Sequence, residues 1–327
     1  MVVGAIAIAI AVPVIAIVVV AAMQPSSTKA APSGRSVASG VGTTSTSRVT
    51  TGSMVWAGQS RRWRTFVPAI TDPTKRLPLL VLLHPAGGTY DSFLTQTGMD
   101  SYAEDYHFVT VAPQGAVDGT WDAGGCCGVA RDQGADDIGF INALLDRMVA
   151  TADVDPGQIY VAGASNGGML GYALACRLAD RIQAVFSAGG AQTLQDCHPS
   201  HPVSVIEFHS LLDGMVPSDG GVNPKFAQPL TNFLSTTAVF AAWSGRDNCQ
   251  FENHADAGPG EQLTVWYGCN DNTLLEVWLR TSGGGHEWPK HPDAPVDAST
   301  TISKVIASGS LLRHLGHPSV NPLIAHS

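Results

Sequence analysis

A serine between two glycines, in the stretch Gly163–Gly167 (GASNG), is the part of this sequence best suited to chemistry. The apolar run 158–162 before it predicts a buried strand, and the small, apolar run 168–176 after it predicts a helix. A serine on such a sharp turn is exposed as a nucleophile, and its neighbours must be small because the backbone is strained. The helix N-terminus adds a free N–H and partial positive charge for an oxyanion. We therefore predict that Ser165 is a nucleophile.

A nucleophilic serine needs a histidine base and a carboxylate that orients it, and candidates for both follow predicted strands. Asp213 comes shortly after the apolar run 202–208. His286 comes after the alternating run 274–280 and three consecutive glycines, which leave the backbone free to bring an imidazole over a sheet edge. Ser, Asp, His is the chain order of sheet hydrolases that carry this motif, so we predict Asp213 and His286 as the partners of Ser165.

Other acids and histidines compete for these roles. Asp219 lies farther from its strand than Asp213, in a glycine-rich turn. His84 and His209 each end a predicted strand, where a histidine bonded to the backbone is the usual structural explanation. His198 and His201 lie close together but lack a third ligand, so we predict no metal site.

The turn after an early strand should supply a second donor to the oxyanion. The apolar run 79–83 predicts that strand, and His84–Gly88 follows it. Pro85 has no N–H and cannot donate. We therefore assign the oxyanion hole to the backbone N–H groups of Ala86 and Asn166.

These segments together resemble the secreted esterase family that includes extracellular polyhydroxybutyrate depolymerases, feruloyl esterases and acetylxylan esterases. The resemblance runs from about Val55 to His314 and implies an α/β-hydrolase fold, a Ser-Asp-His mechanism, and ester substrates attached to a polymer or a plant polysaccharide. The chain departs from the family at Pro85, where glycine is usual, and at 209–213, where the sequence HSLLD replaces the usual His-Gly-Thr-Ala-Asp. The segments that carry the resemblance are His84–Gly88, Trp121–Gly128, Asp136–Phe140, Gly163–Met169, His209–Asp213 and Gly283–Pro289.

The elements that position these residues alternate between strands and helices, which predicts a doubly wound, mostly parallel sheet with helices on both faces. Runs 54–57 and 63–67 predict an N-terminal antiparallel hairpin. A helical stripe from Ile138 to Met148 should pack on the sheet, with Asp136 and Asp137 complementing the helix dipole at its start. The six predicted parallel strands are 79–83, 108–112, 158–162, 184–187, 203–208 and 274–280.

Composition excludes several other classes of function. A chain of 327 residues with 44% apolar content can bury one large core. Its net charge of −9 argues against a nucleic-acid partner, and we expect the arginines at 61, 62 and 64 to be solvated. No dinucleotide fingerprint, P-loop, EF-hand loop or H-E-x-x-H motif occurs in the sequence, so we predict that no cofactor is needed.

The N-terminal segment of the chain predicts export. Residues 1–23 form an apolar segment that we interpret as a signal peptide or an N-terminal membrane anchor, although it lacks a basic start. Residues 24–52 are rich in Ser, Thr, Ala and Gly, which is typical of a disordered linker. The catalytic domain should span 53–316, with a tail at 317–327. We expect a secreted enzyme, or one anchored to the outer face of the membrane; the sequence leaves the oligomeric state open.

Six cysteines, an even count, agree with an oxidising compartment. Cys176 ends the predicted helix after Ser165, and Cys197 lies in the loop after the next strand. Cys249 and Cys269 bracket a polar excursion. We predict Cys176–Cys197 and Cys249–Cys269 disulfides, which leaves the adjacent cysteines at 126 and 127 as a vicinal pair or as two thiols.

Access to the site is predicted from short loops. The stretch 188–202 is too short for a large helical lid, and an open cleft suits a polymer chain or a polysaccharide-linked ester. Trp121 and Trp288 lie in loops near the sheet edge, where they could stack on a substrate or pack in the core. The competing hypothesis is a non-catalytic surface protein that binds carbohydrate or polyester on a hydrolase scaffold.

Overall fold

A computed structural model describes residues 46–69, 72, 74–223 and 231–309 of the chain. The apolar segment 1–23, most of the predicted linker and the predicted tail lie outside these residues. Among the described helices, none is both long and apolar enough to cross a bilayer.

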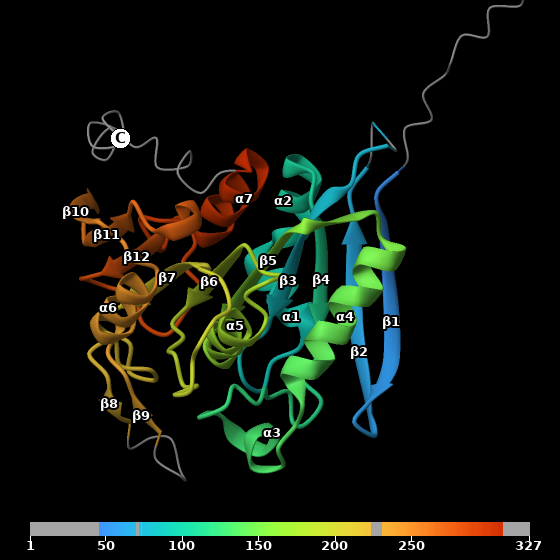
Figure 1. Ribbon diagram of the computed structural model, residues 1–327, viewed down its shortest axis with the longest axis horizontal. Helices are drawn as coiled ribbons and strands as arrows, with labels where there is room; N and C mark the ends of the chain where they lie inside the picture. The colour runs from blue at the N-terminus through green and yellow to red at the C-terminus, as the bar shows by residue number, and fades with distance from the viewer. Residues whose placement is uncertain (1–45, 70–71, 73, 224–230, 310–327) are drawn as a thin grey trace, which may run out of the picture. The chain divides into compact units, whose positions relative to one another are not determined.

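The first two strands form the predicted antiparallel hairpin (Figure 1). β1 (Arg48–Trp56) pairs with β2 (Gln59–Val67) in a register that sets Arg48 opposite Val67. β1 therefore begins inside the range predicted to be linker. The cause is its place at the edge of the sheet, where a mostly exposed strand can be built from Ser, Thr and Gly and is held by backbone pairing.

The central sheet has ten strands in the order β1-β2-β4-β3-β5-β6-β7-β12-β11-β10. Pairing is parallel from β4 through β12, and antiparallel at both ends. All six predicted parallel strands are present, so the doubly wound α/β prediction is confirmed (Figure 1). These strands are β3 (Leu77–Leu83), β4 (Val109–Pro113), β5 (Val154–Ala164), β6 (Ala184–Ala188), β7 (Ser204–Ser210) and β12 (Leu275–Arg280).

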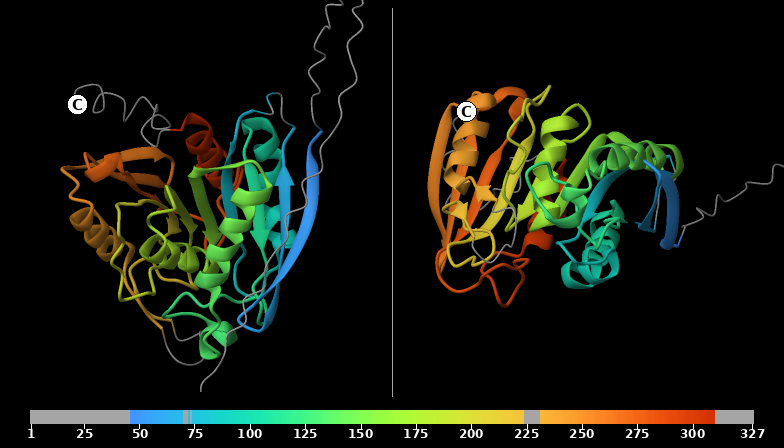
Figure 2. Two further views of the ribbon diagram at one scale, coloured as in Figure 1. Left: turned by 45° about the vertical axis from the view of Figure 1, so that its right-hand side comes forward. Right: turned by 90° about the horizontal axis from the view of Figure 1, so that it is seen from below.

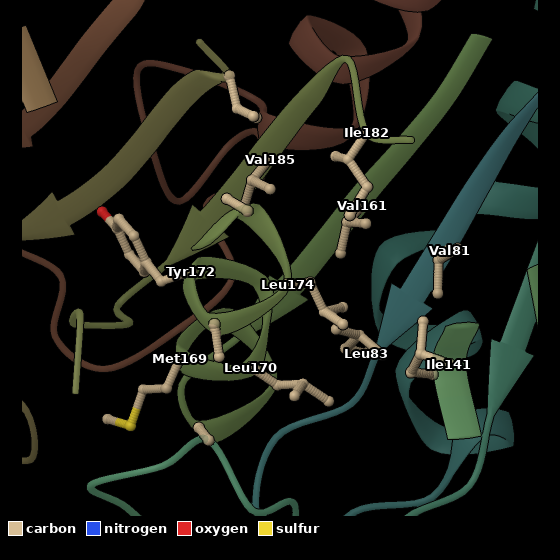
Figure 3. Packing of buried hydrophobic residues seen from close by; sticks show 14 of the residues in the cluster. Val81, Leu83, Ile141, Val161, Met169, Leu170, Tyr172, Leu174, Ile182 and Val185 are labelled. Atoms are coloured by element: carbon tan, nitrogen blue, oxygen red, sulfur yellow. The ribbon is translucent and has the colours of Figure 1, made fainter. Parts of the chain in front are cut away.

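Two hydrophobic layers cover the sheet because strand side chains alternate between its faces. In β3, Leu79, Val81 and Leu83 join one buried cluster, whereas Leu80 and Leu82 join the other. The first cluster packs on α4 (Asp137–Thr151), α5 (Asn166–Arg177) and α6 (Thr236–Arg246) (Figures 2 and 3). The second packs on α1 (Tyr90–Thr97), α2 (Met99–Tyr106) and α7 (Ala298–Ser308).

The start of α4 differs from the prediction. Asp136 caps the helix by accepting a hydrogen bond from Gly139 N, as a residue that complements the dipole should. Asp137 instead is buried and pairs with Arg61, which is only 1% exposed. The expectation that Arg61 is solvated is therefore wrong, because β2 turns this side chain inward, over the ring of Phe140.

Disulfides join all six cysteines. Cys176 is bonded to Cys197 and Cys249 to Cys269, the two pairs expected from the sequence. Cys126 and Cys127 form a vicinal pair, which resolves the alternative that the sequence left open. Cys176 ties the last turn of α5 to the loop between β6 and β7.

The long segment between β7 and β12 contains elements that the sequence did not reveal. β10 (Phe251–Gly258) and β11 (Glu261–Tyr267) form an antiparallel hairpin that extends the sheet beyond β12. The residues that were interpreted as a polar excursion thus form two strands. Their composition is polar because one face of this hairpin is solvated. The remaining short elements are α3 (Gly128–Asp132), β8 (Gly221–Val222), β9 (Asn232–Phe233) and the 3₁₀ turn η1 (Asn270–Asn272).

Candidate active site

Ser165 occupies a strained turn between β5 and α5. Its φ of 52° and ψ of −120° lie in a region that residues with a side chain rarely adopt. Ser165 N donates to Ala188 O at 2.8 Å, which fixes the turn against the end of β6. Gly167 approaches the Leu83 and His84 carbonyl oxygens so closely that a Cβ atom would collide with both. The glycine therefore brings the start of α5 against the end of β3.

His286 lies between Ser165 and Asp213 and contacts both. Its Nε2 atom is 2.8 Å from Ser165 Oγ, and its Nδ1 atom is 2.7 Å from Asp213 Oδ2. A carboxylate only accepts hydrogen bonds, so Nδ1 carries a proton and Nε2 is free to accept the serine proton. The loop after β12 reaches this position through Gly283 and Gly284, whose φ values of 65° and 69° suit glycine.

Asp213 is held in a tight loop directly after β7. Its Oδ1 atom accepts hydrogen bonds from Met215 N at 2.8 Å and Val216 N at 2.9 Å, while Oδ2 faces His286. Burial alone would raise the pKa of Asp213, but hydrogen bonds from His209 and His286 lower it below the usual value for an aspartate. Asp213 is therefore a carboxylate at neutral pH. The rival Asp219 makes no bond to His286.

A second histidine lies within ion-pair distance of Asp213. His209, at the end of β7, lies with Nε2 3.4 Å from Asp213 Oδ2 and 2.8 Å from Val216 O. Its Nδ1 atom is 3.0 Å from Glu207 Oε1. The predicted backbone bond is present, but sequence reasoning missed both carboxylates. The available signal was Glu207, the one acidic residue in the predicted strand 202–208.

The predicted oxyanion donors come from two segments that meet. Asn166 is the first residue of α5. Its Oδ1 atom accepts a hydrogen bond from Trp121 N at 2.8 Å, and its Nδ2 atom donates one to Trp121 O at 3.0 Å. The His84–Gly88 loop begins where Gly167 packs on β3, and Ala86 is exposed on it. His84 is buried and accepts a hydrogen bond from Gly115 N at 3.0 Å; burial lowers its pKa, so its ring is neutral.

Neither predicted substrate-stacking tryptophan is on the surface. Trp121 is fully buried and donates from Nε1 to His84 O at 2.9 Å. Trp288 is 4% exposed, meets Phe93 edge-on and donates from Nε1 to Ser299 Oγ at 3.0 Å. The prediction that they bind substrate is therefore corrected: both rings pack in the core, and each N–H finds a partner there.

Exposed apolar side chains flank Asp213 instead. Leu211 is 44% exposed, Leu212 is 58% exposed and Met215 is 38% exposed. We call these three residues the apolar rim. Two of them, Leu211 and Leu212, lie in the segment HSLLD at which the sequence departs from the pattern of the family that it resembles, so this departure places apolar surface beside the carboxylate. Within the described residues, no group of three or more His, Cys, Asp and Glu side chains could hold a metal ion.

The parallel sheet, the strained serine and the Ser-His-Asp contacts define the α/β-hydrolase class. A solved acetyl xylan esterase from Aspergillus awamori shares this fold, with a TM-score of 0.53 and 14% identity over 75% of this chain and 96% of that one. The family model described as Esterase PHB depolymerase matches residues 65–210.

Two curated relatives are similar over about two thirds of this chain. Feruloyl esterase C of Emericella nidulans is 29% identical over 68% of this chain and 74% of its own length. Feruloyl esterase B of Piromyces equi is 27% identical over 65% of this chain, which spans only 40% of that longer protein. The chain is therefore similar to polyhydroxybutyrate depolymerases, feruloyl esterases and acetylxylan esterases, and it is a carboxylic ester hydrolase.

Proposed function

We propose that the chain is a serine esterase in which Ser165 is the nucleophile, His286 the general base and Asp213 the group that orients it. The observation that carries this proposal is the position of His286, with Nδ1 2.7 Å from Asp213 Oδ2 and Nε2 2.8 Å from Ser165 Oγ. Both distances suit proton transfer without any movement of the backbone.

The reaction proceeds in two steps through an acyl-enzyme. His286 Nε2 takes the Ser165 proton as Oγ attacks the ester carbonyl, and the Ala86 and Asn166 amides donate to the resulting oxyanion. Each such donor is worth about 3 kcal/mol of transition-state stabilisation. His286 then protonates the departing alkoxide, activates a water molecule, and returns the proton to Ser165 as the acid leaves. Asp213 keeps the required tautomer throughout.

We propose that the substrates are polymeric or polysaccharide-linked esters with an apolar acyl group. The apolar rim offers surface to such a group beside Asp213. The segment between β6 and β7 contains no helix that could form a lid, which supports access for a long chain. The descriptions of the family model and of two relatives, PHB depolymerase and feruloyl esterase, agree with ester substrates of this kind.

We further propose that the enzyme acts outside the cell, either released or anchored through its N-terminal segment. The apolar run 2–22 supports export, and the disulfides Cys176–Cys197 and Cys249–Cys269 fit an extracellular protein. The negative net charge speaks against a nucleic-acid partner.

Labelling with a fluorophosphonate probe tests this proposal. The probe should modify Ser165, and Ser165→Ala should lose both labelling and hydrolysis of p-nitrophenyl butyrate while the protein stays folded. Ser60→Ala, at an exposed serine of β2, is the matched control and should retain both. An unlabelled wild-type protein that still bound polyester would favour a non-catalytic binder. Turnover of methyl ferulate, acetylated xylan and polyhydroxybutyrate granules, compared in parallel, then identifies the acyl group.

A further inference from the structure

A continuous path of polar side chains runs from the nucleophile into the interior of the protein. Beyond Asp213 it passes through His209 and Glu207 on β7 to the Tyr172 hydroxyl, which donates to Glu207 Oε2 at 3.0 Å. Glu207 and Tyr172 are at most 1% exposed and His209 is 4% exposed. Tyr172 comes from the face of α5 that packs on the sheet (Figure 3). The mechanism above uses none of these three residues.

The contacts of His209 favour a protonated ring. Val216 O only accepts, so the nitrogen 2.8 Å away, Nε2, carries a proton. Nδ1 lies 3.0 Å from Glu207 Oε1 without forming a hydrogen bond to it, and the charge of this carboxylate favours a proton on Nδ1. With both nitrogens protonated, the ring is an imidazolium between two carboxylates. Burial alone would lower the pKa of His209, but Asp213 and Glu207 raise it to about 10.

Charged groups on the neighbouring strands complete the surroundings of His209. Glu261 of β11 and Arg280 of β12 border the same small cavity as His209. Arg280 forms an ion pair with Glu287 at 2.9 Å. Burial raises the pKa of Glu261 to about 7, so this carboxyl is only partly charged at neutral pH. The direct ionic contacts of His209 are therefore those with Glu207 and Asp213.

We propose that His209, kept cationic by Glu207, is a positioning residue that holds Asp213 Oδ2 toward His286 and sets the pH at which the site becomes active. This inference rests on the proposed function of the triad. Asp213 Oδ2 is shared by two imidazoles, at 2.7 Å from His286 and 3.4 Å from His209. His209 contributes no proton to the reaction. It supplies a fixed positive charge on the far side of the orienting carboxylate.

The sign of the effect follows from charge repulsion. Protonation of His286, which inactivates the base, places a second cation near Asp213, and a cation at His209 disfavours that event. Removal of the His209 charge should therefore move the acid limb of the kcat/KM profile to higher pH, by about 0.5 to 1 unit. Glu207→Gln should also move the acid limb to higher pH, because a neutral amide does not stabilise the positive charge of the His209 ring.

The experiment combines nitrogen-15 NMR of labelled histidines with pH profiles of four variants. His209→Gln keeps a donor for Val216 O, Glu207→Gln removes the counter-ion, and Tyr172→Phe removes one hydrogen bond but no charge. His198→Gln is the matched control, because this histidine also pairs with a carboxylate, Asp196, but its side chain is 84% exposed. Profiles are measured on p-nitrophenyl butyrate, with thermal unfolding in parallel.

We expect an imidazolium signal that persists at pH 8.5 in the wild type and disappears in His209→Gln. We also expect both charge-removing variants to shift the acid limb upward, with Tyr172→Phe and His198→Gln within about 0.2 unit of the wild type. A neutral His209 at pH 7, or lower activity with an unshifted acid limb, would overturn the proposal. If the variants do not fold, a wild-type spectrum without any imidazolium signal at pH 8.5 still overturns the proposal. The spectrum does not depend on activity, so a failed triad assignment, seen as an active Ser165→Ala, is recognised separately.

Discussion

Replacement of Asp213 by asparagine tests the orienting role of this side chain, because the structure dictates how the amide must sit. The Oδ1 position accepts from Met215 N and Val216 N, so the asparagine oxygen must stay there. The amide nitrogen then points at His286 Nδ1, which becomes an acceptor. The proton moves to Nε2, where it faces Ser165 Oγ and abolishes the base.

The size of the loss can be estimated from the tautomer requirement. An aspartate-to-asparagine change in the triad of a serine protease costs about 10⁴ in kcat, or roughly 5.4 kcal/mol. A weaker ester bond needs less assistance, so we expect a loss of about 10³ to 10⁴ in kcat/KM at pH 7.5. The assay is hydrolysis of p-nitrophenyl butyrate, with circular dichroism to establish that the variant is folded.

Asp219→Asn is the matched control, since Asp219 lies on the same loop without contacting His286. It should change kcat/KM by less than about threefold. A loss of less than tenfold in Asp213→Asn, or an equal loss in both variants, would refute the argument from the tautomer.

Two further predictions concern pH and specificity. Burial raises the pKa of Glu261 to about 7 in the folded state, so the free energy of unfolding should fall as the pH rises from about 4.5 to 7. Glu261→Gln should remove that fall. The variant should therefore raise the free energy of unfolding by about 1 kcal/mol at pH 8 but change it little at pH 4. Urea unfolding at the two pH values measures this, and an equal gain at both would contradict it. Leu212→Ser should lower kcat/KM for p-nitrophenyl butyrate by about fivefold and for the acetate by less than twofold, because a 58% exposed leucine can contact only the longer acyl chain. Equal losses on the two esters would count against a role of the apolar rim in specificity.

The positions of Ser165, Asp213 and His286 could be predicted because each follows a recognisable parallel strand. Carboxyl ends of parallel strands meet at one edge of a sheet, so residues far apart in the sequence were expected to converge there. β5, β7 and β12 do bring these three side chains into contact. The glycines around Ser165 and before His286 gave the turns that this convergence requires.

Other features depended on burial, which a single sequence does not report. β1 and β10 contain no buried residue, so their composition resembled that of loops. Trp121 and Trp288 fell in loop sequences, yet both rings are buried. The same limit applies to charged residues: Arg61 is buried although arginines usually remain solvated, because Asp137 neutralises it.

The direct test of the central claim is to trap the acyl-enzyme. A rapid-mixing experiment with p-nitrophenyl acetate, followed by acid quenching and peptide mass spectrometry, should show a stoichiometric burst of p-nitrophenol and an acetyl group on Ser165. Steady turnover without a burst, or with the acetyl group on a different residue, would contradict the account.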